Sequence, residues 1–195
     1  MPHPKLLLHT CCAPCLTAVE ERLREAYAIT LYWYNPNIYP QAEYDRRLAE
    51  LERFSKIIQC ELIIPPLRDD RSQWERAVVD YAHEPEGQRR CQECILFRLQ
   101  STAAYAKEHG FAVFCTTLTV SPHKNAAVIN NLGRKLGETY NIAFLEADFK
   151  KQDGYRRSIE LSQEHGLYRQ NYCGCRYSQQ EQEARQRRIL LANHI

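Results

Sequence analysis

The chain has 195 residues, of which 44% are hydrophobic and 26% charged, and its formal net charge at pH 7 is +2. This length favours one domain spanning residues 1–195, and no apolar run approaches the length that crosses a bilayer. The N-terminal apolar stretch is too short for a secretory signal, so we expect a soluble protein of the cytoplasm, and the small net charge alone does not predict nucleic-acid binding.

Short apolar runs alternate along the chain with longer amphipathic segments, the pattern of a parallel sheet covered by helices. The apolar runs predict five strands, at residues 5–10, 28–38, 60–66, 111–120 and 142–149. The amphipathic segments predict helices at residues 17–27, 41–59, 73–81, 91–109, 125–140, 155–165 and 178–191. We therefore expect an α/β fold with an open, doubly wound parallel sheet, helices on both faces, and a C-terminal helical tail at 178–195. Ligands of such sheets lie beyond the carboxyl ends of the strands.

Cysteines are the most informative residues of this chain. Nine thiols in a reducing compartment indicate metal binding or redox chemistry more than structural disulfides. Two of them, Cys60 and Cys115, lie in or beside apolar strands and are predicted to be small core residues. The others form three short motifs, Cys11-Cys12-x-x-Cys15, Cys91-x-x-Cys94 and Cys173-Gly174-Cys175.

The first two motifs lie where helices are predicted to begin, and a helix N-terminus favours thiolates. Two such pairs of thiolates can enclose one soft metal centre. A structural zinc site with four sulfurs is the alternative, and C-x-x-C pairs alone favour it over iron and sulfide. The adjacent pair Cys11-Cys12 is unusual for zinc fingers, and its place at a strand end favours a functional centre.

Cys173-Gly174-Cys175 differs from the other two motifs. A disulfide between residues two apart closes a small strained ring, which is easily reduced, and glycine supplies the backbone freedom that the ring needs. The motif therefore predicts a redox-active pair. Two further metal ligands or two idle thiols are the alternatives.

Four segments, LLLHTCCAPC, RRCQECILFRL, TTLTVSPHKN and LYRQNYCGCRYS, occur in this order between Leu6 and Ser178. In sequence and separation they resemble the cobalamin-independent epoxyqueuosine reductases of the QueH type. The resemblance implies a fold like that of the adenine nucleotide α-hydrolases (HUP-like). It also implies an oxidoreductase that reduces the epoxide of epoxyqueuosine, at the wobble position of tRNA, to queuosine as the last step of queuosine synthesis.

The resemblance further implies a [4Fe-4S] cluster and an external electron donor. The matching cluster ligands are Cys11, Cys12, Cys91 and Cys94. Cys173 and Cys175 match the redox-active disulfide of the family. A second, single metal ion, iron or zinc, is implied beside the cluster, with Cys15 as its candidate ligand at a position where members carry cysteine or aspartate.

The tRNA substrate predicts a surface that combines aromatic and cationic side chains, because single-stranded loops are recognised by stacking and by contacts to phosphate. We expect such contacts from Lys124, Tyr168, Arg169 and Arg176. Relatives of the same fold bind ATP through a serine- and glycine-rich loop after the first strand. Here that loop is CCAPC, so we expect no ATP binding.

Two other functions use the same cysteines. One is a zinc-binding, non-catalytic RNA-binding protein, in which the thiols are structural ligands. The other is an iron-sulfur tRNA thiolation enzyme of the same fold, which should consume ATP and therefore fits the CCAPC loop poorly. Iron and acid-labile sulfide in anaerobically purified protein would distinguish the zinc protein from the two others.

Overall fold

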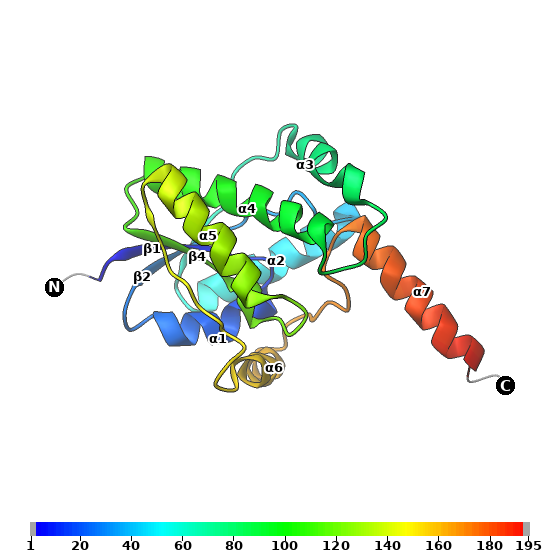
Figure 1. Cartoon of the computed structure of the whole chain (residues 1–195). Helices are drawn as coiled ribbons and strands as arrows, with labels where there is room; N and C mark the ends of the chain where they lie inside the picture. Colours follow the sequence, from blue (N-terminus) through cyan, green and yellow to red (C-terminus); the bar gives the residue numbers. More distant parts are fainter. Residues whose placement is uncertain (1–2, 193–195) are drawn as a thin grey trace.

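The apolar runs of the sequence form one parallel sheet. The computed structural model describes residues 3–192. Its strands are β1 (Lys5–His9), β2 (Ala28–Tyr32), β3 (Glu61–Ile63), β4 (Val113–Thr116) and β5 (Ala143–Phe144). They pair in the order β3-β2-β1-β4-β5, and every pair is parallel. The α-helices are α1 (Ala13–Leu23), α2 (Gln41–Ile57), α3 (Asp70–Val78), α4 (Arg89–Glu108), α5 (Ala126–Tyr140), α6 (Gly154–Glu164) and α7 (Arg176–Ala192) (Figure 1).

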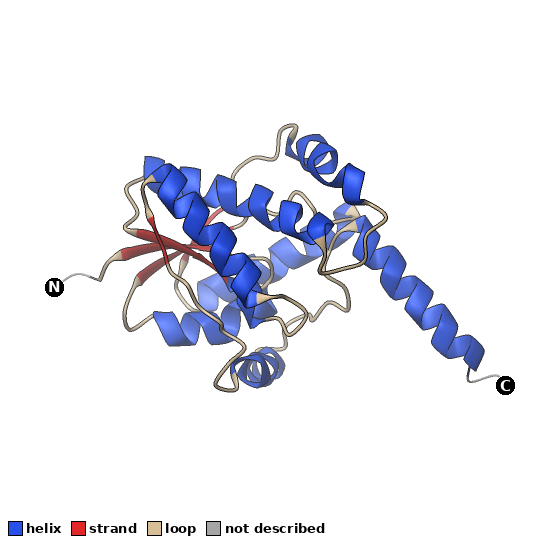
Figure 2. Ribbon diagram, viewed as in Figure 1, coloured by secondary structure: helices blue, strands red, loops and turns tan. Residues whose placement is uncertain are grey.

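The central strand β1 contributes to the core on both faces of the sheet. Leu6 and Leu8 pack with side chains of α1 and α2, whereas Leu7 packs with side chains of α4 and α5. Successive side chains of a strand point to opposite faces, so a strand between two helical layers is apolar throughout. Figure 2 shows the strands between these layers, and α6 joins the first layer by packing on α1. The doubly wound, HUP-like α/β fold predicted from the sequence is confirmed.

The strands are shorter than the apolar runs that predicted them. In the run 111–120 only the residues of β4 pair with β1. The next residues, Thr117–Val120, form a 3₁₀ helix, and the Thr116 hydroxyl caps it by accepting a hydrogen bond from the Leu118 N–H. In the run 142–149 only β5 pairs with β4. The remaining apolar residues, such as Val120 and Phe149, lie buried in loops against the core. The apolar runs therefore predicted burial correctly, but the paired part of each strand is shorter than its apolar run.

Helix α7 leaves the body of the molecule. Tyr177, in its first turn, packs against Trp74 of α3, whereas Ile189 and Leu191 near its end are exposed. Figure 1 shows the helix projecting away from the other elements. It begins two residues before the predicted tail. Among residues 3–192, no helix combines the length and the apolar character of a transmembrane span.

Helices α1 and α6 approach each other closely at Gly154. A β-carbon at this position would lie 1.9 Å from the Phe149 carbonyl oxygen and 2.8 Å from Arg22 Nη2. The Arg22 guanidinium is itself fixed, because it donates hydrogen bonds to the carbonyl oxygens of Phe149, Lys151 and Gln152. The first turn of α6 therefore reaches its place only without a side chain.

Replacing this glycine should move α6 from α1. We expect Gly154→Ala to lower the free energy of unfolding by about 1–3 kcal/mol, the usual cost of overpacking, as measured by urea denaturation. Gln163→Ala, at an exposed position of the same helix, is the control and should change stability by less than about 0.5 kcal/mol. Equal stability of the two variants would show that the turn before α6 relaxes freely.

Candidate metal centre

The chain connections diverge between β1 and β4. β2 and β3 lie on one side of β1, whereas β4 and β5 lie on the other, so a crevice forms at the carboxyl ends of the two central strands. Cys11 follows β1 at this point. Its N–H donates a hydrogen bond of 3.3 Å to the hydroxyl of Thr117, the residue after β4. The first cysteine motif thus lies at the crevice where doubly wound sheets bind their ligands.

Cys11, Cys12 and Cys15 form one compact group, in which the three Sγ atoms lie within 4.8 Å of one another. Cys12 has an extended backbone and is the N-cap of α1, and Cys15 lies in the first turn of the helix, after Pro14. The turn from strand to helix folds the three thiols together at a helix N-terminus, which favours negative charge.

These three thiols differ in how readily they ionise. The thiols of Cys12 and Cys15 hydrogen-bond to Cys11 and hold its pKa well below the usual value. The charge at Cys11 in turn raises the pKa of Cys12 to about 12 and raises that of Cys15. A metal ion would let all three ionise, and thiolates prefer iron, zinc and other soft centres. The group could therefore hold a metal.

Cys91 and Cys94 lie in the first two turns of α4. Cys91 is half-buried, with its Sγ accepting a hydrogen bond of 3.3 Å from the Gly87 N–H, and Cys94 is buried. Burial raises the pKa of Cys91, although the nearby Lys124 ammonium opposes this. The two thiols do not belong to the compact group of three. They line a separate, smaller space, named here the inner cavity, together with Cys173 and Cys175.

The inner cavity adjoins a cavity of about 460 Å³, named here the thiol cavity, which is lined by Cys11, Cys15 and Cys173. Arg98 and Cys173 line both cavities. The thiols of the strand end and of α4 therefore face a common region from two sides. This donor set, thiols at two helix starts around a cavity, fits an iron-sulfur centre.

Four buried cations surround the same region. Arg47 pairs with Glu43 at 2.7 Å, Arg90 with Glu181 at 2.6 Å and Lys124 with Glu86 at 2.7 Å, each at less than 9% side-chain exposure of the cation. The fourth is Arg98. The sequence analysis did not single out this residue, although Cys91, Cys94 and Arg98 follow the i, i+3, i+7 spacing of one helical face. That spacing was the available signal.

Residues 168–175, named here the cysteine segment, close one side of the site. Arg47 donates hydrogen bonds of 3.0 Å and 3.3 Å to the carbonyl oxygens of Cys173 and Tyr172. Gly174 has a φ of +133°, and a β-carbon there would lie 3.0 Å from Arg47 Nη1. Glycine is therefore required between the two cysteines. Both are free thiols here, and burial, followed by the charge of Cys173, raises the pKa of Cys175 to about 11.

Gln170 connects the cysteine segment to the metal-binding group. Its Nε2 donates a hydrogen bond of 3.0 Å to Cys12 Sγ. Its Oε1 is buried and has no hydrogen-bond partner among residues 3–192, and the residue lines the thiol cavity. The amide therefore positions one thiol and leaves an acceptor for a ligand.

The four residues expected to contact tRNA are placed differently from one another. Lys124 and Arg169 line the thiol cavity, but the Lys124 ammonium is buried in its wall rather than exposed. Tyr168 and Arg176 do not line it. The Tyr168 hydroxyl donates a hydrogen bond to Glu43, and Arg176 forms an ion pair with Glu75 of α3. Arg185 of α7, which was not among the four, also lines the thiol cavity.

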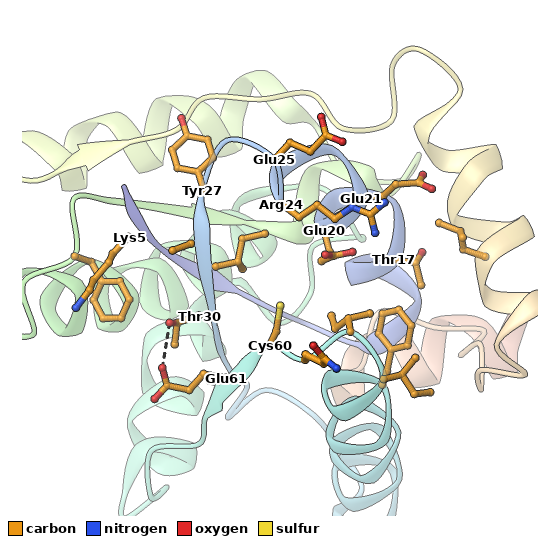
Figure 3. A pocket seen from close by; sticks show the side chains of 18 of the residues that line it. Lys5, Thr17, Glu20, Glu21, Arg24, Glu25, Tyr27, Thr30, Cys60 and Glu61 are labelled. Atoms are coloured by element: carbon orange, nitrogen blue, oxygen red, sulfur yellow. Dashed lines mark hydrogen bonds between the residues drawn. The ribbon is translucent and has the colours of Figure 1, made fainter. Parts of the chain in front are cut away.

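A larger cavity, of about 1010 Å³, opens at the opposite, amino ends of the strands (Figure 3). Its wall combines the carboxylates of Glu20, Glu21 and Glu25 with one thiol, Cys60. Cys60 is half-buried, and burial raises its pKa to about 11. Cys115 is buried within β4, as predicted. With a single neutral thiol, this cavity lacks the donor set found at the carboxyl ends, which are therefore the candidate site.

Comparisons with known proteins point to one family. The family model described as "Epoxyqueuosine reductase QueH" matches residues 6–181. The chain is 41% identical over 179 residues to the epoxyqueuosine reductase QueH of Streptococcus pyogenes serotype M1, an alignment that covers 90% of this chain and 70% of the relative. It is 37% identical over 174 residues to the protein of that name from Thermotoga maritima, with 89% of both chains covered. The chain therefore belongs to the epoxyqueuosine reductase QueH family.

Proposed function

We propose that this protein is an epoxyqueuosine reductase that converts epoxyqueuosine at the wobble position of tRNA to queuosine, the last step of queuosine synthesis. The observation that carries the proposal is that thiols from the β1–α1 turn, from α4 and from the cysteine segment line two adjoining cavities at the crevice of the sheet. In this proposal a [4Fe-4S] cluster is held by Cys11, Cys12, Cys91 and Cys94.

The reaction needs two electrons and two protons, because the epoxide oxygen leaves as water and the two carbons become an alkene. When bound, the cluster supplies electrons one at a time at low potential. The Cys173 and Cys175 thiols release two electrons and two protons when they form a disulfide, which an external donor then reduces. Cys173 lines both cavities, so it is well placed for this role.

The chain's own side chains bind and orient the substrate in this proposal. A cavity of about 460 Å³ lies within the usual range for small-molecule sites and suits a nucleobase extruded from the anticodon loop. The unpartnered Gln170 Oε1 is an acceptor for a hydroxyl or amine of the modified base. Arg169 and Arg185 lie in the cavity wall and supply charge for the phosphates next to that base.

Cys15 is the proposed ligand of the second metal ion, iron or zinc. Its Sγ lies with those of Cys11 and Cys12 in the compact group of three thiols. Such a group also supports the zinc-binding, non-catalytic RNA-binding alternative, because three thiolates with one further donor complete a structural zinc site. The metal content of the protein separates the two functions.

The first experiment measures metal and turnover together. Protein purified without oxygen should be brown and contain iron and acid-labile sulfide. It should convert epoxyqueuosine-containing tRNA to queuosine-containing tRNA with a reductant, as detected by nucleoside mass analysis. Cys91→Ser should lose iron and activity, whereas Cys60→Ser, at the opposite end of the sheet, should retain both. A colourless protein with zinc alone would support the non-catalytic alternative.

The dithiol role is tested without disturbing the proposed cluster ligands. Cys173→Ser and Cys175→Ser should keep the iron content of the wild type but lose turnover with a thiol-based physiological reductant, because neither variant can form the disulfide. Cys60→Ser is again the control. Unchanged turnover in both variants would remove the dithiol from the mechanism.

Affinity for tRNA should fall as salt concentration rises, because phosphate contacts release counterions. We expect Arg169→Gln to reduce the slope of log affinity against log salt by about 1. Arg134→Gln is the control: Arg134 lies on α5, and the substitution removes only an exposed ion pair with Glu146, so the slope should stay unchanged. Binding that is independent of salt would contradict a phosphate-contacting surface.

A further inference from the structure

Arg98 is a fully buried cation at the centre of the site. It retains 2% of its accessible surface. Its Nε donates to the Cys94 carbonyl oxygen at 3.2 Å and its Nη1 donates to Asn35 Oδ1 at 3.3 Å. Both acceptors are neutral. The guanidinium thus has polar contacts but no anionic partner among them.

No carboxylate balances this charge among residues 3–192. The three other buried cations of the site, Arg47, Arg90 and Lys124, each pair with a glutamate at 2.7 Å or less. A buried charge without a counter-charge is strongly unfavourable. The negative charge that balances Arg98 must therefore come from the thiols or from what they hold.

Arg98 lies between the two sets of thiols. It lines the thiol cavity together with Cys11 and Cys173, and it lines the inner cavity together with Cys91, Cys94 and Cys173. Three of these four thiols are proposed cluster ligands, and they come from the two different helix starts. Arg98 is therefore the cation whose side chain faces both sets of thiols.

We propose that Arg98 is a positioning residue whose guanidinium is the counter-charge of the anionic centre held by Cys11, Cys91 and Cys94. The inference rests on the proposed function, since it assumes that these thiols hold an iron-sulfur cluster. A cluster with four thiolate ligands is a net anion and gains a further negative charge when it is reduced. A buried guanidinium beside it stabilises the reduced form and raises the reduction potential.

The inference predicts different effects of one substitution on the empty and the loaded protein. In Arg98→Met an apolar side chain replaces the unbalanced buried charge, which offsets the loss of the hydrogen bond to Asn35, so the metal-free variant should melt close to the metal-free wild type. Reconstitution with iron and sulfide should stabilise the variant less than the wild type. Its affinity for iron should fall about 10-fold, at the lower end of the effects of outer-sphere partners.

The reduction potential of the reconstituted centre, measured by titration without oxygen, gives a readout that does not depend on turnover. It should be more negative in Arg98→Met than in the wild type, whereas Arg98→Lys, which keeps the charge, should stay close to the wild type. Arg90→Met is the matched control on the same helix. Because it leaves Glu181 unpaired, it should destabilise the metal-free protein as well as the loaded one.

Three results would contradict the inference. If metal-free Arg98→Met melts well below the metal-free wild type or does not fold, Arg98 has a structural role that is independent of the thiols. If the variant binds iron with the affinity of the wild type and its centre has the same reduction potential, the Arg98 charge does not act on the centre. If the wild type itself takes up no iron and sulfide, both the proposed function and this inference fail. The iron and sulfide content of the wild type distinguishes this result from the other two.

Discussion

The divergence of the chain between β1 and β4 is the constraint on which the site depends. In a parallel sheet the connecting helices run opposite to the strands, so α1 and α4 both begin at the carboxyl edge. Their N-termini carry partial positive charge and bring Cys11, Cys12, Cys91 and Cys94 to this edge. Two distant cysteine motifs therefore need no special loops to approach each other, because the topology of the sheet brings both helix starts to one crevice.

The electrostatics of the crevice follow from this crowding of sulfur. Thiols packed in a low-dielectric interior cannot all ionise, and the charge of Cys11 accordingly raises the pKa of Cys12 and of Cys15. Buried cations lower the cost of further negative charge. Most of these cations are themselves balanced by glutamates, which keeps the metal-free site close to neutral, whereas Arg98 remains available to an anionic ligand. The charges of the site therefore favour an anionic ligand.

Much of this arrangement can be predicted from the sequence, for physical reasons that also set the limit. The strand KLLLH lies between two helical layers, so both its apolar run and its end before Cys11 could be predicted from the sequence. The ends of the other strands were not, because Val120 and Phe149 are buried by loops rather than by pairing. Lys124 looked like a surface cation, and only its contact with Glu86, 38 residues away, places it inside the wall. Long-range partners of this kind leave no local pattern.

The cysteine segment shows how backbone contacts can fix two cysteines without specifying their neighbours. Arg47 binds the carbonyl oxygens of Tyr172 and Cys173, groups that every residue possesses, while the positive φ and close contact at Gly174 restrict that one position to glycine. The side chains of the segment are then free for other tasks, as in the bond from Gln170 to Cys12. Because Arg47 also pairs with Glu43 on α2, the dithiol is anchored to the helical layer that packs on β1, so the rigid core holds Cys173 between the two cavities.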